Sequence, residues 1–245
     1  MRFLAIIPAR YESTRFPGKA LAPLLGKPLI QRVYEQARQV KGLHDIFVAT
    51  DDERIKDCVE GFGGRAVMTR RDHPSGSDRL AEAAEILGLD RHDLVFNIQG
   101  DQPVFPPLVI GHMAAVMERD CAAVMVTPAR RLTDMEVAVD PNVVKVVFNQ
   151  QGRALYFSRS PLPYWRNGER PYFYKHIGIY AYRVDFLKDF VTLHPGRWEQ
   201  ADKLEQLRAL EYGYPIHVVE TEEDTLEVDT PEDLERAEAY LRGSI

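Results

Sequence analysis

The sequence is poor in cysteine, in excess positive charge and in long apolar runs, and each shortage excludes a class of protein. Its 245 residues include only two cysteines, Cys58 and Cys121, without C-x-x-C spacing, so neither a disulfide scaffold nor a zinc ribbon fits. Lys and Arg number 31 against 37 Asp and Glu, a net charge of −6, which argues against nucleic-acid binding because that needs a basic face. No apolar run approaches the ~18 residues of a membrane span. Residues 1–8 are too short for a signal peptide and lack a cleavage site, so we expect a cytoplasmic globular protein.

Apolar residues are plentiful, and their spacing predicts an α/β fold. The 45% hydrophobic content suits a sizeable core, and the length fits one large domain, residues 1–245. Short apolar runs alternate with amphipathic stretches through the first half, which predicts a parallel sheet with helices on both faces. The predicted strands are 3–7, 45–49, 66–68, 94–98 and 122–126, and the predicted helices are 29–40, 53–60, 77–87 and 106–118.

The pattern changes after about residue 130. A hairpin is predicted over 143–148 and 154–157, with a glycine in its loop, and another strand over 176–182. Helices near 184–192 and 202–212, a strand at 215–219 and a helix from Pro231 follow. We expect this half to complete the same sheet, now mixed, and to add a β-rich subdomain at about 130–180.

A basic loop follows the first predicted strand, where ligands of open α/β sheets bind. It holds Arg10, Ser13, Arg15 and Lys19, and it lacks the glycines of a G-x-G-x-x-G or Walker A motif. Its cations, hydroxyls and backbone N–H groups suit a polyphosphate. The alternative is a solvated basic loop.

Two carboxylates are candidate metal ligands. Asp101, in the segment Gln99–Pro103, ends the fourth predicted strand, a common place for a Mg²⁺ ligand but also for an ordinary turn. Asp229 precedes Thr230, which is expected to cap a helix without help from Asp229. A metal role for Asp229 is expected only together with Asp101. The triplet at 50–52 is interpreted as a helix cap.

Further polar residues are informative only as a group. Ser77 lies at the start of a predicted helix, where it either presents its hydroxyl to a ligand or belongs to a plain cap. Arg159, His176, Glu205 and Gln206 lie on predicted ordered elements of the second half. Each alone is more often structural, but together they would suit a polyhydroxylated acid.

Eight motifs follow one another along the chain. They are 7–10 (IPAR), 13–19 (STRFPGK), 75–79 (SGSDR), 98–101 (IQGD), 154–159 (ALYFSR), 176–180 (HIGIY), 204–208 (LEQLR) and 228–234 (VDTPEDL). Their order resembles that of the 3-deoxy-manno-octulosonate (KDO) cytidylyltransferase, or CMP-KDO synthetase, family, and the resemblance runs from about residue 2 to 241. Two departures are visible: Gln102 stands where the family often has Glu, and Glu227 where it often has Gly.

The resemblance implies a Rossmann-like, GT-A-like nucleotidyltransferase fold and a homodimer. It also implies a reaction, CTP plus KDO giving CMP-KDO plus pyrophosphate, with Mg²⁺, in the cytoplasm, toward lipopolysaccharide. The β-rich subdomain would contribute to the sugar site and to dimer contacts. No side chain stands out as a general base for the reaction. The implied catalytic residues are Arg10, Lys19, Asp101 and Asp229, of which Asp101 and Asp229 hold the metal; the nucleotide-binding residues are Arg10, Ser13, Arg15, Lys19, Ser77, Gln99 and Asp101; and the sugar-binding residues are Arg159, His176, Glu205 and Gln206.

Two alternatives stay open. The same chemistry could act on 8-amino-KDO or on another 2-keto sugar acid such as a sialic acid. A catalytically inactive nucleotide-sugar sensor is the non-enzyme alternative, disfavoured because Lys19, Asp101 and Asp229 are all retained.

Overall fold

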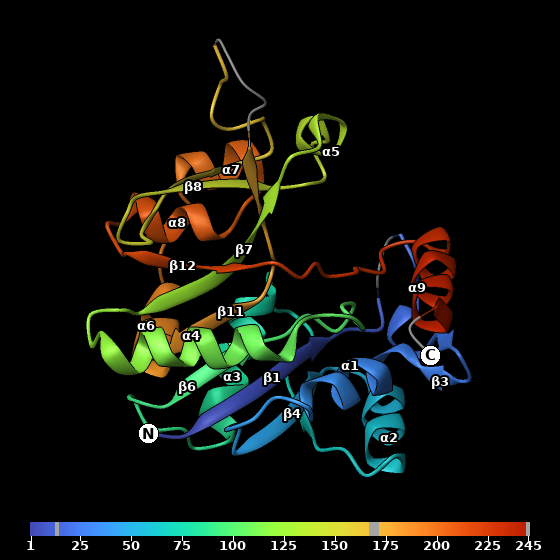
Figure 1. Cartoon of the computed structure of the whole chain (residues 1–245). Helices are drawn as coiled ribbons and strands as arrows, with labels where there is room; N and C mark the ends of the chain where they lie inside the picture. The colour runs from blue at the N-terminus through green and yellow to red at the C-terminus, as the bar shows by residue number, and fades with distance from the viewer. Residues whose placement is uncertain (13–14, 167–171, 244–245) are drawn as a thin grey trace.

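The computed structural model describes residues 1–12, 15–166 and 172–243. Its main sheet has ten strands in the order β5-β4-β1-β6-β11-β7-β10-β8-β9, with β12 paired to β7 (Figure 1). It is a mixed sheet with helices on both faces, as the sequence predicts.

The first half of the chain forms the parallel part of the sheet. Strands β1, β4, β5 and β6 pair in the order third, second, first, fourth, which is the order of a Rossmann half. This order places the carboxyl ends of β1 and β6 side by side. The elements are β1 (Phe3–Ala9), α1 (Leu29–Ala37), β4 (Asp45–Thr50), α2 (Glu53–Gly61), β5 (Ala66–Met68), α3 (Gly76–Ile86) and β6 (Leu94–Asn97), with the short 3-10 helix η1 (Lys19–Leu21) and the small hairpin β2 (Pro23–Leu24) and β3 (Lys27–Pro28) between β1 and α1.

The second half completes the sheet with mostly antiparallel pairs. Strand β11 joins β6 to β7, and β10, β8 and β9 follow, while β12 lies parallel to β7. The elements are α4 (Pro107–Arg119), β7 (Met125–Leu132), α5 (Met135–Val139), β8 (Lys145–Phe148), β9 (Ala154–Ser158), β10 (Phe173–His176), β11 (Tyr180–Arg183), α6 (Val184–Phe190), α7 (Arg197–Asp202), α8 (Gln206–Glu211), β12 (Ile216–Thr221) and α9 (Pro231–Gly243).

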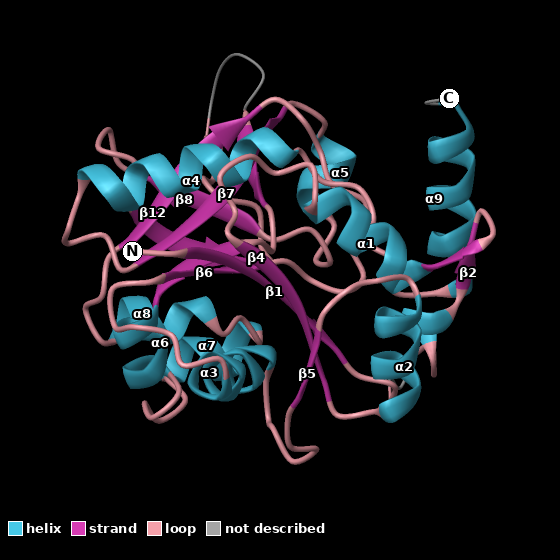
Figure 2. Ribbon diagram, turned by 90° about the horizontal axis from the view of Figure 1, so that it is seen from below, coloured by secondary structure: helices cyan, strands magenta, loops and turns pink. Residues whose placement is uncertain are grey.

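The core lies in two layers, one on each face of the sheet (Figure 2). Successive residues of β1 point to opposite faces, so Ala5 and Ile7 pack with α1 and α4, while Leu4 and Ile6 pack with α3, α6 and α8. Burial on both faces explains why β1 is a continuous apolar run. Helix α9 stands apart, packed on β2 through a small cluster that contains Leu24 and Ala237.

Three predicted elements differ from the structure. The strand expected over 122–126 begins at Met125 and runs to Leu132. The strand expected over 176–182 is divided into β10 and β11 around Gly178. The helix expected over 202–212 begins only at Gln206, because the left-handed backbone of Lys203 (φ 55°) ends a separate helix, α7, just before it.

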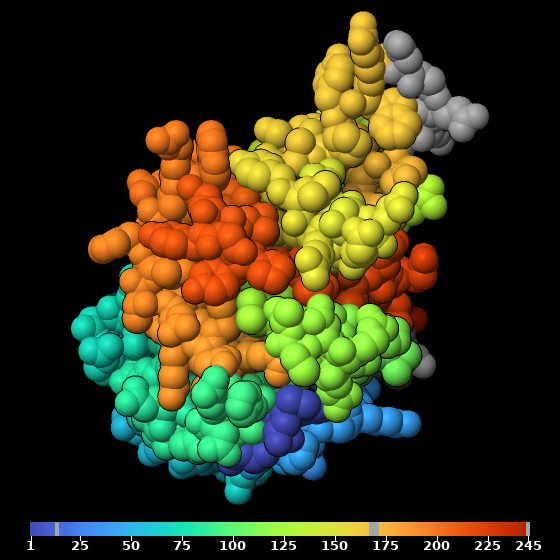
Figure 3. All heavy atoms as spheres, turned by 90° about the vertical axis from the view of Figure 1, so that its left-hand side faces the viewer, coloured from blue at the N-terminus to red at the C-terminus, as the bar shows by residue number. Residues whose placement is uncertain are grey.

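The region around β9 rises above the rest of the surface, as Figure 3 shows in yellow and gold. It exposes large apolar side chains, including Leu155 and Tyr164. Among the helices of the described residues, none combines the length and the apolar character that a membrane crossing requires.

Candidate active site

The loop after β1 turns back on itself and places Lys19 at the carboxyl end of the sheet. The backbone N–H of Gly18 donates to the carbonyl of Tyr11 at 2.9 Å. Gly18 has φ +72°, and a Cβ there would lie 3.2 Å from the Tyr11 ring, so the turn favours glycine. Lys19 then begins η1.

The ends of β1 and β6 approach each other closely at Gly100. A Cβ at this position would lie 2.7 Å from the Pro8 carbonyl oxygen. The close approach of β1 therefore requires a glycine at this position. The consequence is that Asp101 emerges directly beside the basic loop.

A long-range contact brings the second carboxylate to the same place. The segment 226–229 runs beside 101–104, with Val228 N–H donating to the Asp101 carbonyl at 2.8 Å and Leu226 N–H to Val104 at 3.1 Å. Thr230 caps α9 by accepting from the Asp233 N–H at 3.2 Å, as predicted. The Asp229 carboxylate takes no part in this cap and can face the site.

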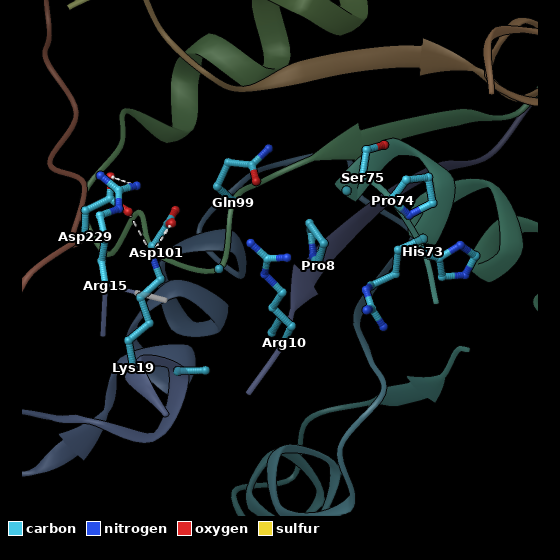
Figure 4. A pocket seen from close by; sticks show the side chains of 15 residues that line it. Pro8, Arg10, Arg15, Lys19, His73, Pro74, Ser75, Gln99, Asp101 and Asp229 are labelled. Atoms are coloured by element: carbon cyan, nitrogen blue, oxygen red, sulfur yellow. Dashed lines mark hydrogen bonds and ion pairs between the residues drawn. The ribbon is translucent and has the colours of Figure 1, made fainter. Parts of the chain in front are cut away.

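Four charged side chains gather at this end of the pocket (Figure 4). Lys19 Nζ lies 2.7 Å from Asp101 Oδ2 and 3.0 Å from Asp229 Oδ1, and Arg15 Nη2 lies 3.0 Å from Asp229 Oδ2. Burial of Lys19 opposes its charge, but the two carboxylates outweigh this effect and raise the pKa of its ammonium. The ammonium shows that both carboxylates can share one cation.

These side chains border a cavity of about 300 Å³. In Figure 4, Arg10 and Gln99 lie between the charged cluster and the opposite end, which is formed by His73, Pro74 and Ser75. Ser13 lies outside the described residues. Of the predicted residues, the cavity is lined by Arg10, Arg15, Lys19, Gln99, Asp101 and Asp229.

The predicted residue Ser77 links the start of α3 to the predicted sugar set and does not line this cavity. Its hydroxyl donates to Glu205 Oε2 at 2.7 Å, while Ser75 caps the helix. Burial raises the pKa of Glu205, although Ser77, Ser75 and Arg208 oppose this shift. Gln206 is buried at the start of α8.

His176 is buried, and its hydrogen bonding fixes its tautomer. The Thr127 hydroxyl lies 2.9 Å from His176 Nε2, 3.1 Å from the Ile177 carbonyl and 2.8 Å from that of Ile179. The hydroxyl has one hydrogen, and donating it to Nε2 would leave the hydroxyl oxygen facing two carbonyl oxygens at 2.8 and 3.1 Å. Thr127 therefore donates to a carbonyl and accepts the Nε2–H of His176. Nδ1 is then an acceptor, suited to a substrate hydroxyl.

This burial predicts a pH dependence of stability. Burial, with a smaller effect of Lys175, lowers the pKa of His176 to about 3. The unfolded chain takes up this proton below about pH 6.5, so the stabilisation is fully present above that pH and is lost as the pH falls toward 3. Urea unfolding should show wild type losing about 2 kcal/mol more than His176→Gln between pH 6.5 and 4.5. Parallel pH profiles for the two proteins would contradict this assignment.

Arg159 is held by backbone carbonyls. Its Nε donates to Asp202 O at 2.8 Å and its Nη1 to Pro141 O at 2.9 Å. The buried Lys145 in turn donates to the carbonyl of Arg159 at 2.6 Å. Neither guanidinium hydrogen bond uses Nη2, so this nitrogen can still bind another group. None of the four predicted sugar-binding residues lines the cavity described above.

The sequence interpretation gave no role to three residues of this region. Arg79 lines the cavity, held by Asp51 at 3.1 Å and by Thr69, and His73 lines it while paired with Glu82. Tyr180 packs against His176, with ring centroids 5.4 Å apart. Arg79 and Tyr180 stand in motifs that the sequence does show, whereas His73 lies in a loop without a local signal.

A divalent cation is compatible with the two carboxylates. Among the described residues, no set of three or more His, Cys, Asp or Glu side chains is arranged to hold a metal ion. Mg²⁺, however, is usually bound by one or two carboxylates together with substrate phosphates. Asp101 and Asp229, which already share one cation, fit that arrangement.

Comparison with known proteins shows the family of this chain. Residues 4–224 match the family model described as cytidylyltransferase. The chain is 53% identical over 242 residues to an 8-amino-3,8-dideoxy-manno-octulosonate cytidylyltransferase of Shewanella pealeana, covering 98% of this chain and 99% of the relative. It is 52% identical over 237 residues to a 3-deoxy-manno-octulosonate cytidylyltransferase of Syntrophobacter fumaroxidans, covering 96% and 95%. A solved structure of a CMP:2-keto-3-deoxy-manno-octonic acid synthetase complexed with CTP covers both chains fully, with 43% identity and a TM-score of 0.94.

Proposed function

Because this chain belongs to the cytidylyltransferase family, we propose that it transfers the cytidylyl group of CTP to KDO, releasing pyrophosphate. The observation that carries the proposal is the convergence of Lys19, Asp101, Asp229 and Arg15 at one end of a cavity that Arg10 also lines. The cytoplasmic location and the role in lipopolysaccharide synthesis are parts of this proposal.

In the proposed reaction the anomeric hydroxyl oxygen of the sugar bonds to the α-phosphorus of CTP, and the bond from that phosphorus to the bridging oxygen breaks. The electron pair leaves with pyrophosphate, and the hydroxyl proton passes to water. Both substrates are anionic, so the site must reduce their repulsion and stabilise the leaving group. Arg10, Arg15 and Lys19 carry the positive charge for this purpose, and Gln99 adds an amide to the cavity wall.

We propose that Asp101 and Asp229 hold Mg²⁺ when the substrates are bound. The ion supplies positive charge that polarises phosphate and hydroxyl oxygens. Lys19 is then free to turn from the carboxylates to phosphate, which a flexible ammonium can do because it is a point charge on a long stem.

The sugar is proposed to lie toward β10 and β11. His176 Nδ1 would accept from a sugar hydroxyl, and Glu205 and Gln206 would contact other hydroxyls. Arg159 would grip the carboxylate with the part of its fork that the backbone carbonyls leave unused.

Replacing Arg159 by lysine tests the carboxylate contact. Lysine cannot form two parallel hydrogen bonds, and losing a charged hydrogen bond costs roughly 1.5–3 kcal/mol. Steady-state kinetics should show the KM for KDO rising at least about tenfold, with the KM for CTP nearly unchanged. Arg153→Lys, on the hairpin loop, is the matched control. A CTP defect with normal KDO kinetics would assign Arg159 to the nucleotide.

The second candidate substrate is 8-amino-KDO, favoured by the name of the Shewanella relative. Pyrophosphate release from CTP with each sugar acid tests the proposed activity. No sugar-dependent release with either one would favour the nucleotide-sugar sensor.

A homodimer is also proposed, supported by the exposed Leu155 and Tyr164, and its test is the mass measured by light scattering.

A further inference from the structure

Gln102 and Glu227 face each other beside the candidate metal site. Gln102 Nε2 donates to Glu227 Oε1 at 2.8 Å, across the contact between segments 101–104 and 226–229. These two positions are also the ones at which the chain departs from the pattern of the family it resembles. The two residues that depart from the family pattern lie far apart in the sequence but are in contact in the structure.

Glu227 is placed between the metal-binding carboxylates and the predicted sugar residues. Asp101, Asp229 and Lys175 lie close enough to act on its charge, and Glu227 in turn acts on Tyr180 of β11. Gln102 lies against the turn between β10 and β11, with its Nε2 3.7 Å from where a Gly178 Cβ would be. Gln99 reaches the same turn, with Nε2 3.4 Å from the Gly178 carbonyl. Both glutamines therefore border the space expected to hold the sugar.

The charge of Glu227 is not balanced by a neighbouring side chain. Lys19 is bound to Asp101 and Asp229, Arg15 to Asp229, and Lys175 to Asp224 at 2.7 Å. Across the described ranges, no cation forms an ion pair with Glu227, whose side chain is exposed. An extra carboxylate beside two anionic substrates is unfavourable unless a substrate brings positive charge of its own.

Gln102 fixes the direction of this carboxylate. Its side chain is 1% exposed, and its buried Oε1 has no hydrogen-bond partner among the described residues. The amide is thus oriented only by its bond to Glu227.

Resting on the proposed function, we propose that Glu227, oriented by Gln102, forms a subsite for an ammonium on the sugar acid. In the ring form of an octulosonate the ring oxygen joins C2 to C6, so the C7–C8 tail leaves the ring at C6, across the ring oxygen from the reacting C2. An amine at C8 would therefore lie near the metal-binding carboxylates, where Glu227 is placed. With this subsite the enzyme would still use KDO, but it would prefer the sugar acid with an amine in place of the C8 hydroxyl.

Competition between the two sugar acids tests this preference. Pyrophosphate release with CTP and Mg²⁺ gives kcat/KM for the 8-amino and the 8-hydroxyl sugar, and wild type should favour the amine at least about tenfold. Glu227→Gln keeps the shape and removes the charge, so the ratio should fall about tenfold or more. Glu223→Gln, the same change on an exposed residue nearby, should leave the ratio unchanged.

The outcomes separate this inference from the proposed function. Equal use of both sugars by wild type, or an equal fall for both in Glu227→Gln, would overturn the ammonium subsite and leave the cytidylyltransferase activity standing. Turnover of neither sugar by wild type would overturn both. A binding titration of the 8-amino sugar to wild type and Glu227→Gln supplies a second readout, and equal affinities would also overturn the subsite.

Discussion

Asp101→Asn and Asp229→Asn should each lower turnover by about a hundredfold or more. Both carboxylates already share one cation, the Lys19 ammonium, and either amide would lose the negative charge that we propose holds Mg²⁺. Loss of an electrostatic group that acts on developing charge costs about two to three orders of magnitude in kcat. The measurement is pyrophosphate release at saturating CTP and sugar acid over a range of Mg²⁺ concentrations.

The matched control for this prediction is Asp57→Asn, which removes the same charge from the exposed side of α2. It should leave turnover unchanged. The asparagine variants should also require more Mg²⁺ for half-maximal rate than wild type does, because each retains only one of the two carboxylates. Near-normal rates for both variants at saturating Mg²⁺ would remove Asp101 and Asp229 from the metal site.

The fold and half of the site follow from local patterns in the sequence. Alternating apolar runs and helical stripes predict the layers, and the rule that ligands bind beyond strand ends points to Arg10, Lys19 and Asp101. Capping residues were predictable for the same reason: Asp52 accepts from the Arg54 N–H, and Thr230 from that of Asp233. Each of these depends on residues that are neighbours along the chain.

The remaining features depend on contacts between distant segments. The contact between segments 226–229 and 101–104 places Asp229 beside Asp101 and Glu227 beside Gln102. No local sequence pattern predicts this contact. The acceptor on His176 is set by Thr127 of β7, and the role of Gly100 by the carbonyl of Pro8. The late start of the predicted helix at Gln206 is also not visible locally, because the left-handed Lys203 interrupts an otherwise helical pattern.

Lys19→Ala should weaken the use of CTP far more than that of the sugar acid. Lys19 is the ammonium placed between both carboxylates, and the proposed reaction needs it on phosphate as negative charge moves to pyrophosphate. We expect kcat/KM for CTP to fall by roughly a hundredfold, or about 3 kcal/mol, with a change of less than about threefold in the KM for the sugar acid.

Lys19→Arg distinguishes charge from position in this prediction. Arginine keeps the charge, but its planar fork cannot replace a single nitrogen that lies 2.7 Å from Asp101 and 3.0 Å from Asp229. The arginine variant should therefore recover only part of the loss, whereas Lys27→Ala, which removes a lysine paired with Glu35 on the small hairpin, should leave the kinetics unchanged. Full recovery by arginine would mean that the site needs only positive charge there. Unchanged CTP kinetics in Lys19→Ala would instead mean that the lysine serves only to join Asp101 and Asp229 before substrate binds, and that the arginines carry the triphosphate without it.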